Sequence, residues 1–310
     1  MALEIRKLSP TFGAEISGID ITRPLDPDDE ADVVGAIAEH GVCVYRNTGL
    51  TDETHVWFSR LFGNLWTSRI QTNRAGPDRF DSPYLFDAGN LTREGGITLD
   101  EKALVRKKGD RLWHTDSSFT RERTTYSLLL AHEVTRGGGE TWFADMRAAY
   151  ASLPDATKQR IETLAGEHSY LYSRMRAGFP ITEEEVESAP KARHPLVHVH
   201  PGSGRKSLYI AAHAMGIVGM GREEGRALLQ ELMDWATQPQ FVFSHRWEVG
   251  DLVIWDNFCT MHRGGDYDAA NERRDLRRTT VMASPPPPIV LNPRFADRFD
   301  PAQFEAMAAA

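Results

Sequence analysis

Residues 250–264 have the sequence GDLVIWDNFCTMHRG. The run from Leu252 to Trp255 is unbroken and apolar. A short run of this kind is typical of a strand that is buried on both faces, as strands are inside a barrel or a sandwich. His262 follows that strand closely, so its imidazole is expected beside a buried sheet. The stretch therefore predicts a β barrel or sandwich with a histidine near its core.

A second histidine and a carboxylate stand two residues apart in RLWHTDSSF, at 111–119. Residues i and i+2 of a strand project to the same face, so His114 and Asp116 are expected to converge on one point. Together with His262 they make the facial triad of non-haem Fe(II) oxygenases, which leaves three adjacent coordination positions open. A zinc hydrolase uses the same ligand types but normally keeps one open position. The three residues predict a metal centre and leave both classes open.

Four arginines fall within six residues in NERRDLRRTTV, at 271–281. If the β-branched end makes this segment a strand, alternate residues share a face. One face then carries Arg274, Leu276, Arg278 and Thr280, and the other directs Arg273, Asp275 and Arg277 to solvent. Two inward guanidinium groups need anionic partners, because an unpaired buried charge is costly. A dicarboxylate cosubstrate could chelate iron through a 2-keto acid end and pair its far carboxylate with an arginine, leaving the third position for dioxygen.

The remainder of the chain alternates helices with short strands. Helices are predicted over 27–40, 51–63, 144–152, 154–166 and 223–237, and a buried strand over 41–47. The polar stretch 173–195 is expected to be a mobile insertion. One domain over 1–284 is predicted, followed by a proline-rich extension over 285–310.

Composition excludes several classes of protein. The net charge of −8 argues against nucleic-acid binding, which needs a dominant basic face. The chain shows neither an export signal nor an apolar run long enough to span a membrane, so a cytoplasmic protein is predicted. Cys43 and Cys259 lie in apolar runs and are expected to be reduced and structural.

Several motifs together resemble the TauD/TfdA family of 2-oxoglutarate-dependent dioxygenases. They are LWHTDSSF at 112–119, GGGETWFADMRAAYASLP at 137–154, WDNFCTMHRG at 255–264 and RRDLRRTT at 273–280. The resemblance covers nearly the whole chain and is strongest to the 2,4-dichlorophenoxyacetate (aryloxyalkanoate) dioxygenases. It implies a double-stranded β-helix of jelly-roll type with flanking helices, and iron at His114, Asp116 and His262. It further implies that Arg274 and the Thr141 hydroxyl hold the distal carboxylate of 2-oxoglutarate.

Two parts of the predicted site stay open. The gap between His262 and the arginine segment is one residue longer than the family pattern, so Arg273 is an alternative to Arg274 for the cosubstrate. Arg274 is favoured, because alignment from the RRTT end leaves the insertion in a turn.

For the substrate, Arg278 is predicted to bind a carboxylate. The loop around Ile70 and Gln71 is expected to contact the body of the substrate. His213 is a further candidate, which the resemblance brings near the active site.

The predicted reaction is oxidative decarboxylation of 2-oxoglutarate to succinate and carbon dioxide, coupled to hydroxylation of a small organic anion such as an aryloxyalkanoate. A taurine or alkylsulfonate dioxygenase of the same family is the first alternative. A metal-dependent hydrolase and a non-catalytic cupin-like binding protein are alternatives from other classes. The expected partner is the small anion, without nucleic acid or membrane, and a homo-oligomer is left open.

Overall fold

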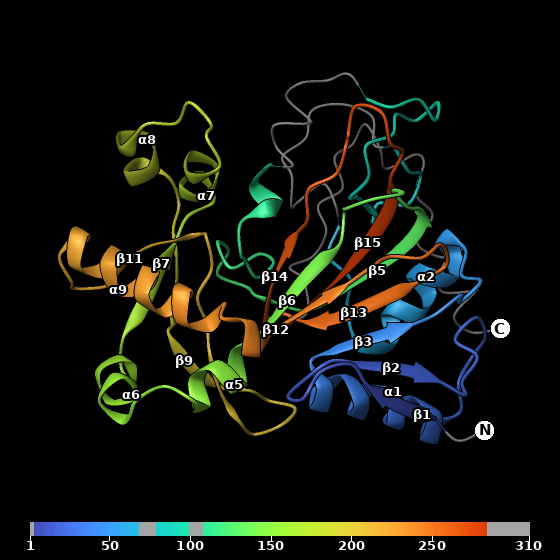
Figure 1. Ribbon diagram of the computed structural model, residues 1–310, viewed down its shortest axis with the longest axis horizontal. Coiled ribbons are helices and arrows are strands. Elements are labelled where there is room, and N and C mark those ends of the chain that lie inside the picture. The colour runs from blue at the N-terminus through green and yellow to red at the C-terminus, as the bar shows by residue number, and fades with distance from the viewer. Residues whose placement is uncertain (1–2, 68–78, 99–107, 284–310) are drawn as a thin grey trace.

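The structure is a computed structural model that describes residues 3–67, 79–98 and 108–283. Figure 1 shows two parts: sheets with helices beneath them on the right, and a lobe of helices and short strands on the left. The mainly β architecture with flanking helices matches the expectation from the sequence. The extension over 285–310 lies outside the described residues, and the single domain over 1–284 stays a prediction.

The larger sheet has seven strands in the order β1-β2-β3-β13-β5-β15-β4. Its strands are β1 (Glu4–Lys7), β2 (Ala14–Ser17), β3 (Val42–Tyr45), β4 (Phe86–Asp87), β5 (Thr124–Glu133), β13 (Leu252–Asp256) and β15 (Asp275–Met282). β2 and β3 pair in parallel, and the other neighbours pair antiparallel. The buried strand predicted at 41–47 is β3. The apolar run of the opening motif is β13, between β3 and β5.

A smaller antiparallel sheet has the order β12-β6-β14. Its strands are β12 (Val242–His245), β6 (Thr141–Asp145) and β14 (Thr260–Gly264). Trp255 of β13 and Phe143 of β6 belong to one buried cluster, which fills the space between the two sheets. Ile254, the preceding residue, packs on the other face of the larger sheet in a cluster that contains Ile37 of the first helix. Both faces of β13 are covered, which explains its unbroken apolar sequence.

Two helices cover the outer face of the larger sheet: α1 (Pro27–His40) and α2 (Asp52–Ser59). The Asp26 carboxylate accepts hydrogen bonds from the first turn of α1, and Gly41 ends the helix with a left-handed backbone (φ 68°). The Thr51 hydroxyl caps α2, which a 3-10 turn (Arg60–Phe62) then extends. The helices predicted over 27–40 and 51–63 are therefore confirmed.

The lobe on the left of Figure 1 contains five helices among the described residues. They are α5 (Met146–Ala151), α6 (Asp155–Ile161), α7 (Tyr170–Arg176), α8 (Glu183–Ser188) and α9 (Arg222–Ala236). Its strands are β7 (Ala165–His168), β8 (Ala192–Pro195), β9 (Val197–Val199), β10 (Lys206–Leu208) and β11 (Ala214–Ile217). Two 3-10 turns complete the described elements, η2 (Gly109–Arg111) and η3 (Pro239–Phe241).

One expectation for this lobe needs correction. The helix predicted over 154–166 ends at Ile161, because the following residues enter β7, the central strand of the sheet β11-β7-β8. The stretch 173–195, expected to be a mobile insertion, holds the end of α7, all of α8 and β8, and its Val186 is fully buried. Whether this stretch moves is a prediction that the structure leaves untested.

Expectations from composition agree with the described residues. Cys43 and Cys259 are free and fully buried. Over the residues that are described, no helix is long and apolar enough to cross a membrane.

Candidate active site

The two predicted histidine ligands face each other across a pair of backbone hydrogen bonds. The His114 amide donates to the His262 carbonyl (2.9 Å), and the His262 amide donates to the His114 carbonyl (2.7 Å). His262 lies on β14, whereas His114 forms an isolated bridge outside any regular strand. The ring centroids are 4.2 Å apart. The pairing brings together side chains that are far apart in the sequence.

Asp116 completes the group, although not by the predicted mechanism. It lies in a turn rather than on a strand, and Ser117 after it has a left-handed backbone (φ 57°). The Asn257 side-chain oxygen accepts a hydrogen bond from the Asp116 amide (3.1 Å). The Ser127 hydroxyl donates to the Asp116 carboxylate (2.7 Å). His114 and Asp116 do converge, as predicted. The predicted reason, alternation along a strand, was wrong.

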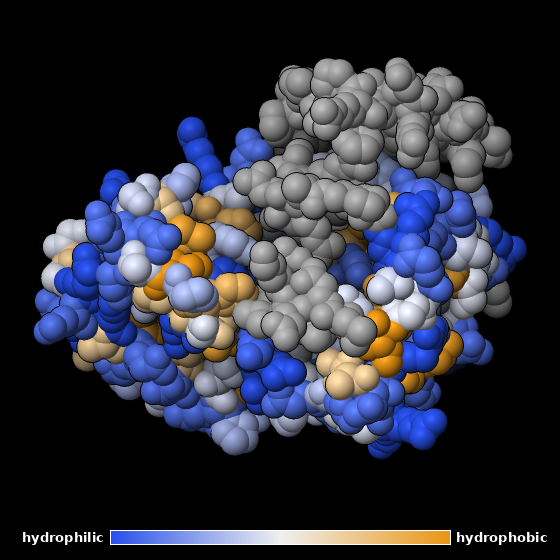
Figure 2. All heavy atoms as spheres, turned by 90° about the horizontal axis from the view of Figure 1, so that it is seen from above, coloured by the Kyte–Doolittle hydropathy of each residue, from blue (hydrophilic) through white to orange (hydrophobic). Residues whose placement is uncertain are grey.

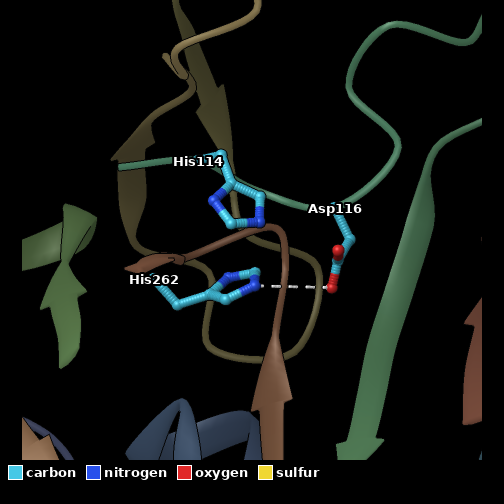
Figure 3. A group of neighbouring side chains, drawn as sticks. All are labelled: His114, Asp116 and His262. Atoms are coloured by element: carbon cyan, nitrogen blue, oxygen red, sulfur yellow. Dashed lines mark ion pairs between the residues drawn. The ribbon is translucent and has the colours of Figure 1, made fainter. Parts of the chain in front are cut away.

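Figure 3 shows the three side chains pointing at a common centre. One ligand atom from each lies within 4.8 Å of the others, and the His262 Nε2 to Asp116 Oδ2 distance is 3.7 Å. All three residues are less than a tenth exposed. Two imidazoles and a carboxylate at this spacing make a donor set for a divalent transition metal.

The protonation states also suit metal binding. The His114 Nδ1 lies 2.7 Å from the Leu112 carbonyl oxygen, so it carries the proton and leaves Nε2 as the ligand atom. Burial, together with the neighbouring His114, holds the pKa of His262 well below its usual value. Burial would raise the pKa of Asp116, but the neighbouring Arg278 guanidinium outweighs it and lowers that pKa. Neutral histidines and an ionised aspartate are the forms that metals bind.

The two arginines predicted to point inward occupy different environments. Arg278 donates through Nη1 to the Asp116 carboxylate (2.5 Å), which places its guanidinium beside the ligand group. Arg274 donates to the Ala88 carbonyl (3.0 Å) and the Gly139 carbonyl (3.2 Å), and its guanidinium lies over the Tyr267 ring. Arg274 forms no ion pair with any residue that the structure describes. It therefore has a charge that an anionic ligand could neutralise.

Thr141, the other predicted cosubstrate residue, begins β6 and is buried. Its hydroxyl accepts a hydrogen bond from the Trp247 indole (3.0 Å). Gly139, two residues earlier, is the residue whose carbonyl binds the Arg274 guanidinium. A short stretch of chain, from Gly139 to Thr141, thus connects Thr141 to the Arg274 guanidinium, and their shared role stays a prediction.

The alternative cosubstrate arginine, Arg273, lies at the surface. Its guanidinium pairs with both carboxylate oxygens of Glu133, at 2.6 and 2.7 Å. The charge of Arg273 is therefore satisfied within the protein, in contrast to that of Arg274. This difference favours the Arg274 alternative.

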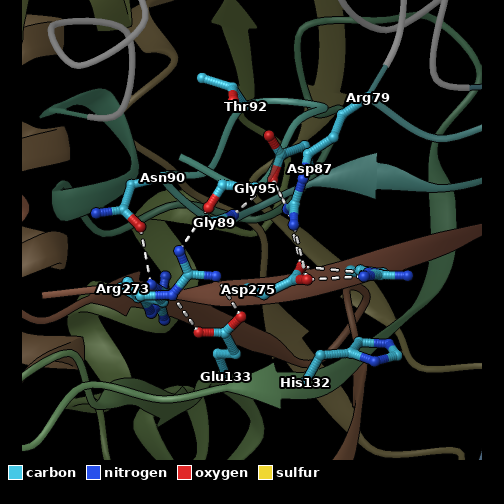
Figure 4. Close-up of polar contacts among 12 residues, drawn as sticks. Arg79, Asp87, Gly89, Asn90, Thr92, Gly95, His132, Glu133, Arg273 and Asp275 are labelled. Atoms are coloured by element: carbon cyan, nitrogen blue, oxygen red, sulfur yellow. Dashed lines mark hydrogen bonds and ion pairs between the residues drawn. The ribbon is translucent and has the colours of Figure 1, made fainter. Parts of the chain in front are cut away.

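The prediction that Arg273, Asp275 and Arg277 point to solvent was wrong in part. Asp275 is 3% exposed and accepts hydrogen bonds from both Arg79 (2.8 and 2.7 Å) and Arg277 (3.2 and 2.7 Å). Arg277 also pairs with Asp52 of α2 (2.6 Å). Figure 4 shows Arg79, from the segment 79–98, paired with Asp275 of β15. The pairing of β15 with β5 shifts its register between Asp275 and Leu276. This shift interrupts the inward and outward alternation of side chains that was assumed from the sequence.

Asn90 is a residue of the site that no sequence pattern indicated. It is fully buried, and its amide nitrogen donates to the carbonyls of Ala269 (2.9 Å) and Glu272 (2.8 Å). Its side-chain oxygen accepts a hydrogen bond from the Arg274 amide (2.8 Å). A side chain at Gly89 would collide with the Arg274 carbonyl, so glycine permits this close approach. Asn90 thus fixes the turn that leads into Arg274 (Figure 4).

The remaining substrate candidates have different outcomes. His213 is buried, and its ring centroid lies 6.0 Å from that of His114. Its Nδ1 lies 3.0 Å from the Ser118 hydroxyl, and burial lowers its pKa well below the usual value. His213 is therefore next to the metal ligands, as the resemblance implied. Ile70 and Gln71 lie outside the described residues.

Comparison with known proteins places the chain in a family. The family described as "Taurine catabolism dioxygenase TauD, TfdA family" matches residues 4–280. An alpha-ketoglutarate-dependent 2,4-dichlorophenoxyacetate dioxygenase of Cupriavidus pinatubonensis is 40% identical over 284 residues, which cover 91% of this chain and 98% of that protein. A (S)-phenoxypropionate/alpha-ketoglutarate-dioxygenase of Sphingobium herbicidovorans is 35% identical over 279 residues, with coverage of 88% and 92%.

A solved structure agrees with these relatives. The crystal structure of AAD-2 in complex with Mn(II) and N-oxalylglycine matches with a TM-score of 0.82 and 40% sequence identity, covering 92% of this chain and 98% of that chain. The likeness confirms the predicted jelly-roll fold, with its two facing sheets and flanking helices. With the buried donor set and the match over 4–280, it leads to one conclusion: the chain belongs to the TauD/TfdA dioxygenase family and is an oxidoreductase.

Proposed function

We propose that this protein is an Fe(II)- and 2-oxoglutarate-dependent dioxygenase that hydroxylates an aryloxyalkanoate such as 2,4-dichlorophenoxyacetate. The observation that carries the proposal is the position of the two arginines of one segment. Arg278 lies beside the metal-binding group, and Arg274 is a second guanidinium that forms no ion pair among the described residues. Each guanidinium would bind one anion, the cosubstrate in one case and the substrate in the other. The names of the relatives supply the chemical class of both.

His114, Asp116 and His262 would hold the iron, and the Leu112 carbonyl would keep the His114 ring in its binding orientation. When bound, the iron supplies the activation of dioxygen by which 2-oxoglutarate becomes succinate and carbon dioxide while the substrate is hydroxylated. Arg274 and the Thr141 hydroxyl would bind the distal carboxylate of 2-oxoglutarate. The buried walls exclude water, which strengthens these charge interactions.

Hydroxylation beside the ether oxygen of an aryloxyalkanoate gives a hemiacetal, which collapses to a phenol and a 2-oxo acid. The substrate carboxylate would bind Arg278, which orients the adjacent carbon toward the metal centre, and His213 would contribute to the same pocket. Homo-oligomer formation and a cytoplasmic location stay predictions from the sequence.

A substrate screen tests the assignment. The protein is incubated with Fe(II), 2-oxoglutarate and air, and succinate release is compared between phenoxyacetates and taurine at equal concentrations. We expect release with phenoxyacetates and little with taurine. The opposite order would assign the protein to the taurine or alkylsulfonate branch, since a tetrahedral sulfonate would then be the preferred anion.

Replacing Arg278 by lysine should weaken substrate binding much more than 2-oxoglutarate binding. Lysine keeps the positive charge but cannot form two parallel hydrogen bonds to a carboxylate. A charge-assisted hydrogen bond contributes about 1.5–3 kcal/mol, so we expect the apparent substrate affinity to fall about tenfold or more. The measurement is the apparent KM of each compound, with Arg273→Lys as the control. Equal losses for both compounds would show that Arg278 does not act on the substrate.

Replacing Asn90 by alanine should raise the KM for 2-oxoglutarate while kcat changes less. The change removes three hydrogen bonds that hold the turn before Arg274 and leaves buried backbone groups unsatisfied, so the guanidinium loses its fixed position. Asn271→Ala is the matched control, because Asn271 is an exposed asparagine in the same turn whose one partner among the described residues is Asp268. An unchanged KM in a folded Asn90→Ala protein would rule out the positioning role.

A further inference from the structure

A cavity of about 320 Å³ lies in the lobe on the left of Figure 1, outside the metal-binding group. Its walls come from α7, from residues 210–214 and from α9. In the view of Figure 2, apolar residues gather on this lobe among hydrophilic ones. Ile210, Ala211 and Leu229 make a buried apolar floor, and the small side chain of Ala227 leaves the space open on the α9 side. The volume falls within the range of small-molecule sites, which is about 300–1,000 Å³.

The charges around this cavity favour an anion. Two arginines line it, Arg176 and Arg226, whereas none of its lining residues is acidic. Arg226 is neutralised within the protein, because Glu183 accepts two hydrogen bonds from it (3.0 and 2.9 Å) and the Met215 carbonyl accepts a third (3.1 Å). Arg176 forms no ion pair with the described residues and lies 6.0 Å from the centroid of the Tyr172 ring. The solvent-exposed Arg176 guanidinium therefore stands beside a cavity that has an apolar floor.

The cavity shares a wall with the metal centre. Ile210 and Ala211 line the cavity, and the next residue, Ala212, donates its amide hydrogen to the Trp113 carbonyl (2.8 Å). His213 follows, with its ring against that of His114. A molecule in the cavity would thus contact the same short segment of chain, residues 210–214, that carries His213 beside the metal-binding group.

We propose that this cavity is a second binding site for a small amphiphilic organic anion, an aryl or alkyl carboxylate. The apolar body lies on the floor between α7 and α9, and the carboxylate binds the Arg176 guanidinium through parallel hydrogen bonds. The proposal goes beyond the proposed function, since this site takes no part in the oxidation.

Equilibrium dialysis with phenoxyacetate tests it, using the anaerobic protein loaded with Fe(II) and 2-oxoglutarate so that no turnover occurs. We expect two phenoxyacetate molecules per chain in the parent protein. Combined Arg176→Gln and Ala227→Phe substitutions should remove one of them, because the first deletes the cation and the second fills the cavity from an exposed helix position. Arg278→Gln should remove the other molecule and leave the cavity occupied.

The double variant has a matched control and a second measurement. Arg160→Gln changes an exposed arginine of α6 that does not line the cavity, and its binding should equal that of the parent. Retained succinate release by the double variant confirms that it is folded. If phenoxyacetate is not the substrate, the parent binds one molecule and the double variant binds none, which still supports the cavity site. Identical binding by the parent and the folded double variant would overturn the proposal.

Discussion

Alanine in place of His114, Asp116 or His262 abolishes 2-oxoglutarate-dependent succinate release in each case. The oxidation would belong to the metal, and each substitution removes one of the three proposed protein ligands. A loss of about a thousandfold or more is expected, which corresponds to a barrier increase of about 4 kcal/mol. Only His262 lies on a regular strand, β14, and no side chain of the three belongs to an apolar core cluster, so the fold should persist. The measurements are Fe(II) binding, succinate release and the circular dichroism spectrum.

The control for these variants is His40→Ala, which changes a histidine at the end of α1 away from the ligand group. It should retain the parent rate and the parent Fe(II) affinity. A loss of only a few fold in any of the three ligand variants would exclude that residue from the metal-binding set.

Arg274→Ala should raise the KM for 2-oxoglutarate by about thirtyfold or more, because losing one side of a buried charge-assisted pair costs about 2–5 kcal/mol. Arg273→Ala is the matched comparison. Arg273 forms an exposed ion pair with Glu133, and such pairs contribute about 0.2–1 kcal/mol. Its removal should leave the KM nearly unchanged. Apparent KM values from succinate release distinguish the two residues.

The reverse pattern, with a large effect at Arg273 and none at Arg274, would mean that the cosubstrate binds at the surface side of the turn. It would also contradict the structure, in which Arg273 pairs with the Glu133 carboxylate whereas Arg274 donates to backbone carbonyls.

The sequence predicted those parts of the fold that depend on local pattern. β13 and β3 were recognised because both of their faces are buried, which leaves an unbroken apolar run. α1 was recognised in its full length because Asp26 caps it and an amphipathic pattern fills it. The helix predicted over 154–166 was too long, because pairing of β7 with two neighbours outweighs local helix preference there.

The metal ligands could be predicted because their chemistry is visible in the residue types. The residues that hold these ligands in place could not be predicted. Asn257 and Ser127 hold Asp116 from positions far along the chain, and no spacing rule connects these residues. Burial of Asp275 likewise depends on Arg79, which reaches it from a distant loop. Strand alternation assumes a regular ladder, and the register shift at the start of β15 breaks that assumption.

The most direct test of the proposed reaction is the product balance with 2,4-dichlorophenoxyacetate. The protein is incubated with Fe(II), 2-oxoglutarate and the herbicide, and succinate and 2,4-dichlorophenol are quantified with and without dioxygen. We expect equal amounts of succinate and phenol in air, and neither product without dioxygen or without 2-oxoglutarate. Phenol release under anaerobic conditions, as by a hydrolase, or an absence of succinate in air, as for a binding protein, would contradict it.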